Sequence, residues 1–178
     1  MDIIASTDTI DRPSTIAWPD AGKLGWVVSP SMSDISRPAS VTAVGNRLCT
    51  AGTPFGYDDY MAATFQFPSG LIGRITANFG CVHRHQHVVR VFGTRATFVS
   101  DDQGARLHTD SDPSVTAKAL TLAALPASKG DLIPDFVRGI QQRDEARQQA
   151  LYEFDVVSAC LAADQSAWAG AAIKVEHV

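Results

Sequence analysis

The hydrophobic pattern of this chain changes its period near Lys129, and that change determines the fold class. Before Lys129 the apolar residues fall in short β-rich runs, at 40–46, 60–67, 71–79, 85–93, 96–102 and 104–110. The Pro-Ser-Gly connection at 68–70 is typical of a hairpin. Because such connections are too short for parallel crossovers, the pattern predicts an antiparallel meander.

Beyond Lys129 the apolar residues recur at helical spacing, and Asp131 is placed to cap a first helix. One face of that helix carries Ile133, Phe136, Val137 and Ile140. A second helix is predicted at 151–170, and we expect its Trp168 in the core. Its apolar stripe consists of Phe154, Val157, Leu161 and Trp168 and is widened by Val156, Cys160, Ala163 and Ala167. A last strand follows at 171–178. We therefore expect an α+β fold, an open and mainly antiparallel sheet with helices packed on one face.

The first 39 residues differ from the rest because prolines interrupt them at Pro13, Pro19, Pro30 and Pro38. A proline removes a backbone donor and breaks long regular elements. We expect 1–39 to be an irregular segment, with one short helix or strand at most, that packs on the domain, and 40–178 to be the α+β domain itself.

Composition excludes several functional classes. With 178 residues and 45% hydrophobic content, the chain can bury one compact core. A net charge of -4 gives no basic footprint for nucleic acid, and no apolar run approaches the roughly 20 residues that cross a bilayer. The three cysteines are widely spaced without a Cys-x-x-Cys motif, which indicates reduced thiols in a cytoplasmic protein.

Two segments together resemble the C-terminal domain of the Gfo/Idh/MocA (glucose–fructose oxidoreductase / inositol dehydrogenase) family. The first, 59–102, has an Asp-led strand, a hairpin with a Gly turn, and a Gly-x-x-Gly-like turn whose second glycine is replaced by Ala96. The second, 131–176, resembles the closing helices and last strand of the family. Its Ala-Ala-x-x-Ser run is matched by Ala162, Ala163 and Ser166. The resemblance covers 40–178.

This resemblance implies a domain that binds substrate and forms oligomers through its open sheet, beside a Rossmann domain that binds NAD(P). The sequence has no Gly-x-Gly-x-x-Gly turn after a strand and no Glu-Lys-Pro motif, so we expect no cofactor in this chain. The family's Asp-x-Gly-x-His-x-x-Asp stretch has its nearest match at 20–27. There Leu24 and Val27 replace the residues that exchange protons, so we assign no catalytic residue.

Three of the five histidines stand at every second position, at His83, His85 and His87. On a strand they would share one face with Cys81, about 7 Å apart. The row would then contribute to a substrate pocket, form a solvated or interfacial strand face, or bind zinc. Zinc needs about four ligands, and nothing in the sequence brings the others together. We take the three histidines as candidate substrate-binding residues and assign no metal site.

The sequence thus favours the substrate-binding and oligomerisation domain of an NAD(P)-dependent oxidoreductase that acts on a sugar or polyol and cannot transfer hydride alone. Two alternatives stay open: a non-catalytic binding or scaffold protein with this fold, and a small metal-dependent enzyme built on the histidine run. We also expect a homo-oligomer, a dimer in the simplest case, through the sheet face that the helices leave open. The histidine row would lie on or beside that contact.

Overall fold

The computed structural model describes residues 4–9, 37–84, 86–122, 128–142 and 144–177. Its elements are β1 (Ile4–Thr9), β2 (Ser40–Asn46), β3 (Tyr60–Gln66), β4 (Ile72–Asn78), β5 (His87–Phe92), β6 (Thr97–Asp101), β7 (Gly104–His108), β8 (Lys118–Leu120), the 3-10 helix η1 (Lys129–Leu132), α2 (Ile133–Gln142), α3 (Asp144–Ala169) and β9 (Ile173–Lys174). Strands followed by helices and a final strand make this an α+β fold, which confirms the predicted class.

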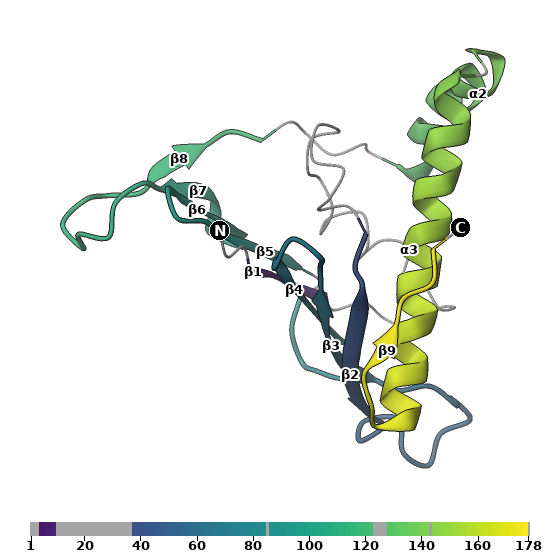
Figure 1. Ribbon diagram of the computed structural model, residues 1–178. Coiled ribbons are helices and arrows are strands. Elements are labelled where there is room, and N and C mark those ends of the chain that lie inside the picture. The colour runs from purple at the N-terminus through teal and green to yellow at the C-terminus, as the bar shows by residue number, and fades with distance from the viewer. Residues whose placement is uncertain (1–3, 10–36, 85, 123–127, 143, 178) are drawn as a thin grey trace.

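The strands form a single nine-stranded sheet in the order β8-β7-β6-β5-β1-β4-β3-β2-β9 (Figure 1). Every neighbouring pair is antiparallel except β1 and β4, which run parallel. The predicted meander is therefore confirmed as two antiparallel halves, one from β2 to β4 and one from β5 to β8. A strand from the beginning of the chain lies between them.

That strand, β1, is a short regular element of the kind expected within residues 1–39, but its place in the sheet was not predicted. Ile4–Thr9 pairs with β4 on one side and β5 on the other, so it occupies the middle of the sheet. Its sequence, IASTDT, has too few large apolar residues to give a period-2 signal. Only its distant partners make it a strand.

The β3–β4 hairpin has the predicted turn at 68–70. Gly70 adopts a φ of 85°, and its N–H donates to the Phe67 carbonyl at 2.9 Å. A side chain strongly disfavours this left-handed backbone conformation, which explains the glycine at the end of Pro-Ser-Gly. The hairpin fixes the register that sets Ala63 opposite Ile75.

The core lies between α3 and the β2–β4 half of the sheet. Ala43, Ala63 and Ile75 occupy one cross-strand row and face the helix. Among the described residues of α3, the buried side chains next to this core are small: Ala159, Ala162, Ala163 and Ser166. Small residues let the backbones of α3 and β2 approach closely, and this contact positions the helix.

The large apolar residues of the two helices are not in this core, which corrects the expected position of Trp168, whereas Ala163 of the widened stripe is buried there. Phe154, Val157, Leu161 and Trp168 lie on the opposite face of α3 and are exposed, with Trp168 at 88%. The apolar face of α2 is exposed as well, because α2 contacts α3 and η1 instead of packing on the sheet. Figure 1 shows α3 along β2 and β9, with α2 at its far end. The expectation that both helices pack on the sheet holds for α3 alone.

The predicted cap at Asp131 is replaced by a short 3-10 turn. Asp131 lies within η1 and its carboxylate accepts hydrogen bonds from the Ser128 N–H and hydroxyl at 3.1 and 3.0 Å. In the part of the chain that the structure describes, no helix is long and apolar enough to cross a bilayer.

Candidate functional site

The histidine run does not form one continuous strand face. β5 begins at His87, whereas Cys81 to His83 lie in bends and His85 lies outside the described residues. The expectation that Cys81 and His83 share one strand face with His87 is therefore wrong, because the chain is still turning at 81–83. His83 is exposed, and its ring Nδ1 lies 2.8 Å from the Arg84 carbonyl oxygen.

His87 lies on the α3 side of the sheet. His87 is paired with Thr9 of β1, and Thr9 is paired on its other side with Ala77 of β4. Ala77 is paired with Met61 of β3, so the four residues form one row across the sheet. Residues paired directly across strands share a face, and Met61 and Ala77 are buried on the side of the core. His87 is half-buried in the same row. The expectation that it borders the open sheet face is therefore wrong.

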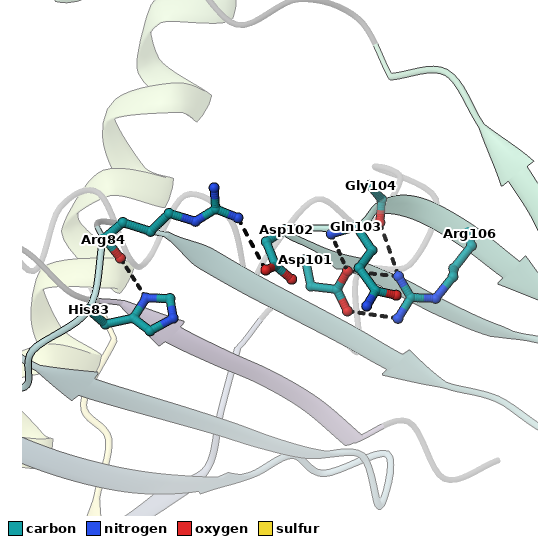
Figure 2. Close-up of polar contacts among 7 residues, drawn as sticks. All are labelled: His83, Arg84, Asp101, Asp102, Gln103, Gly104 and Arg106. Carbon is teal, nitrogen blue, oxygen red and sulfur yellow. Dashed lines mark hydrogen bonds and ion pairs between the residues drawn. The ribbon is translucent and has the colours of Figure 1, made fainter.

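A cluster of polar side chains stabilises the turn between β6 and β7 (Figure 2). The Arg106 guanidinium donates from Nη1 and Nη2 to the two carboxylate oxygens of Asp101, at 2.7 Å each. The Gln103 N–H also donates to Asp101, at 3.0 Å. These hydrogen bonds, from Arg106 above all, lower the pKa of Asp101 to about 2. Asp101 therefore stays ionised and paired at neutral pH, which suits a structural role.

An ion pair joins this turn to the bend that carries His83. Arg84 Nη2 lies 3.1 Å from Asp102 Oδ2, and both side chains are largely exposed. Figure 2 shows the histidine, the arginine and the turn in one row. A solvent-exposed ion pair thus connects the bend before β5 to the β6–β7 turn. Exposed pairs of this kind contribute little to stability.

A second polar cluster, which the sequence analysis missed, lies against the middle of α3. Asp155 is 7% exposed and accepts a hydrogen bond from Arg37 Nε at 2.7 Å. Its other oxygen lies 3.0 Å from His177 Nδ1, and His177 Nε2 lies 2.8 Å from the Pro38 carbonyl oxygen. The Asp155 carboxylate oxygen and the Pro38 carbonyl oxygen can only accept hydrogen bonds. The His177 ring therefore donates to both of them only when each ring nitrogen carries a proton.

This cluster attaches residues 37–38 and the last described residues to α3. The signal that could have revealed it is a lone acid among the small residues of a helix face, since a buried carboxylate needs a partner. Its partners are distant in the sequence. Like the Asp101–Arg106 and Arg84–Asp102 pairs, this cluster serves to position elements. Among the described residues, no group of three or more His, Cys, Asp or Glu side chains could hold a metal ion. The match at 20–27 lies outside the described residues.

The chain resembles known proteins in sequence over part of its length and in fold over nearly all of it. Residues 35–99 match the model of the GFO/IDH/MocA C-terminal domain. No curated protein sequence matches the chain. Among solved structures, the chain is similar to levoglucosan dehydrogenase in complex with NADH and levoglucosan, with a TM-score of 0.64 and 16% identity over 100% of this chain and 59% of that one.

Two other structures give the same result. A NAD-binding protein from Listeria innocua has a TM-score of 0.65 and 14% identity, with 96% of this chain and 54% of that chain covered. An aldose-aldose oxidoreductase from Caulobacter crescentus, complexed with glycerol, has a TM-score of 0.62 and 16% identity, with 96% and 55% covered. The chain thus spans little more than half the length of these proteins, and the resemblance seen in the sequence is confirmed at the level of the fold.

Proposed function

Because the chain has the fold of the Gfo/Idh/MocA C-terminal domain and matches its family model over 35–99, we propose that it is the substrate-binding and oligomerisation domain of an NAD(P)-dependent oxidoreductase acting on a sugar or polyol. The observation that carries this proposal is the shared fold over nearly the whole chain. Two of the similar structures support the substrate class, since one holds levoglucosan with NADH and the other is an aldose oxidoreductase holding glycerol.

The substrate would bind on the α3 side of the sheet, beyond the part that the helix covers. α3 lies along β2 and β9, while β5 to β8 extend away from it (Figure 1). His87 at the start of β5 faces that side and can donate or accept a hydrogen bond to a sugar hydroxyl. Val89 and Ser100, paired across β5 and β6 on the same face, would border it. His83, in the bend before β5, is a secondary candidate, and so is His85, which is outside the described residues.

The cofactor would be held by another part of the enzyme. We expect the purified chain to bind neither NADH nor NADPH, because the sequence contains no glycine-rich turn between a strand and a helix. Fluorescence titration of either reduced cofactor checks this. Saturable binding at micromolar concentration would show that this chain holds a nucleotide site of its own.

Oligomers would form through the sheet face opposite α3. That face of the β2–β4 half carries small and β-branched side chains, Thr42, Ala62, Thr64 and Thr76, around the exposed Arg74. Two such faces can pack about 10 Å apart, and a two-fold axis would make the contact identical in both copies. In this arrangement the sugar site lies on the other side of the sheet and stays open.

The sugar site can be tested by NMR titration of the chain with levoglucosan, L-sorbose and glycerol. We expect saturable shifts of backbone amides in β5 and β6, lost in His87→Ala and kept in His83→Ala, because His83 is exposed in the bend outside the strand. The titration should reach about 10 mM, ten times the upper end of common KM values. Shifts that persist in His87→Ala, or an absence of saturable shifts for all three compounds, would refute the site.

A further inference from the structure

Two cysteines from separate connections lie together at one end of the sheet. Cys49 belongs to the β2–β3 connection and Cys81 to the β4–β5 connection, and both are exposed. A Cβ atom built on Gly80 would overlap both the Sγ and the Cβ atoms of Cys49. The Cys49 side chain therefore occupies the space beside residue 80, directly next to Cys81 in the chain.

Hydrogen bonds hold both cysteines at this position. The Asp59 carboxylate is 3% exposed and accepts from the Cys49 N–H at 2.7 Å and the Thr50 N–H at 2.6 Å. The Asn78 side-chain oxygen accepts from the Gly80 N–H at 3.0 Å and the Cys81 N–H at 3.1 Å. Each cysteine backbone is thus fixed by a side chain at the end of a strand.

The two anchors are themselves connected. The Phe79 N–H donates to the Asp59 carbonyl oxygen at 2.7 Å, which extends the β3–β4 ladder by one residue on each strand. Because Asp59 and Asn78 come from adjacent strands joined in this way, the two connections keep one relative position. The approach of Cys49 to residue 80 is therefore a property of the sheet end rather than of one loop alone.

We propose that Cys49 and Cys81 are a redox-active pair that forms a reversible intramolecular disulfide. Consecutive Cα atoms are about 3.8 Å apart, and disulfides join Cα atoms about 4.4–6.8 Å apart, so a side chain packed on residue 80 is placed to reach the thiol of residue 81. The bridge would link the β2–β3 connection to the bend that carries His83. It does not involve His87, the main residue of the proposed sugar site.

The oxidant is a small disulfide such as oxidised glutathione. One cysteine thiolate attacks it, forms a mixed disulfide and releases one small thiolate. The other cysteine thiolate attacks the protein sulfur of the mixed disulfide and releases the second small thiol. Two protein thiols are thereby oxidised to one disulfide, while one small disulfide is reduced to two thiols.

The third cysteine is an internal control. Cys160 lies on α3, where burial, with a smaller effect from Asp164, raises the pKa of its thiol to about 12. A thiol that stays protonated at neutral pH reacts slowly with disulfides. Cys160 should therefore remain reduced under conditions that oxidise the pair.

The experiment is oxidation of the dilute whole chain with oxidised glutathione, followed by mass spectrometry of the intact protein and of its peptides without reduction. We expect a monomer that has lost two hydrogen atoms, a peptide in which Cys49 is linked to Cys81, and full reversal by dithiothreitol. Cys49→Ser and Cys81→Ser should each lose the linked peptide and gain a glutathione adduct instead, and Cys160→Ser should keep it.

Two outcomes would overturn the proposal. One is stable glutathione adducts on both Cys49 and Cys81 of the unaltered chain without a linked peptide. The other is linkage found only between two molecules.

Gly80→Ala tests the geometry, because the added methyl group would displace Cys49. The linked peptide should then be lost, while circular dichroism shows that the fold is retained. If that variant unfolds, the serine variants still decide the question.

Discussion

The hydroxyl of Ser166 on α3 accepts a hydrogen bond from the Ala43 N–H of β2 at 2.9 Å and donates one to the Ala171 carbonyl oxygen at 2.6 Å. β9 pairs with β2 only at Ser40 and Val41, so the Ala43 N–H lies beyond the end of that ladder. The serine side chain takes the place of the missing strand. This explains why a polar residue is fully buried beside Ala159, Ala162 and Ala163 on the helix face that packs on β2.

Ser166→Ala should lower the free energy of unfolding by about 1–3 kcal/mol, because it leaves the buried Ala43 N–H without an acceptor. Ser158→Ala, on the same helix but only partly buried, is the matched control and should change stability by less than about 0.5 kcal/mol. Urea denaturation followed by circular dichroism measures both. Equal losses in the two variants would contradict the role given to Ser166.

Substitutions on the two faces of α3 should change the free energy of unfolding by different amounts. Ala163 is fully buried against β2, so Ala163→Val should cost about 1–3 kcal/mol by overpacking. Leu161 is 56% exposed on the outer face, and Leu161→Gln should change the unfolding free energy by less than about 0.5 kcal/mol. Denaturation of each variant checks the ranking, and a larger loss for Leu161→Gln would place the outer face in a buried interface.

The open face of the sheet should determine the oligomeric state. Thr64 is partly buried and lies on the face opposite α3, one residue from the core position Ala63. Thr64→Arg would place a like charge at the same point of both copies, so we expect sedimentation velocity to show a dimer for the unaltered chain and a monomer for the variant. Thr42→Ser, on the same face, should stay dimeric. A monomer for the unaltered chain at micromolar concentration would exclude the contact.

The Asp101–Arg106 pair should stabilise the chain in a pH-dependent way. The pKa of Asp101 is lowered from 3.8 to about 2 in the folded chain, so its contribution is complete above about pH 4 and is lost as the pH falls toward 2. Asp101→Asn should therefore lower Tm at pH 7 and have little effect near pH 2. Asp102→Asn, whose partner Arg84 is largely exposed, should change Tm less at either pH. Thermal melts over this range would contradict the assignment if the two variants behaved alike.

The parts of the fold that local patterns determine could be predicted from the sequence. The strand at 40–46, the 68–70 hairpin and the two helices depend on alternation, turn residues and helical spacing, all of which act within a few residues. The buried face of α3 could not be predicted, because the helix is apolar on both sides and only close packing against β2 selects the alanines. Periodicity identifies an apolar stripe without saying what covers it.

The candidate sites likewise depend on contacts between segments that are distant in the sequence. The histidine run was visible in the sequence, but the start of β5 at His87 depends on the pairing with β1. The Asp155 cluster joins Arg37, Asp155 and His177, whose separation in the chain hides any motif. The contact of Cys49 with Gly80 likewise needs two connections that meet only in the folded sheet. Features made by distant segments leave no local pattern.

The central position of β1 has a consequence for how this sheet assembles. Ile4 pairs with Ile72 and Thr7 with Val89, so the two halves of the meander are joined by contacts between segments that are far apart in the chain. Pairings of this kind have high contact order and form slowly, because a long loop must close before any contact is gained. Until β1 arrives, β4 and β5 each expose an unpaired edge to other chains. The six-residue strand β1, with few apolar side chains, therefore controls the interval in which this protein is most prone to aggregate.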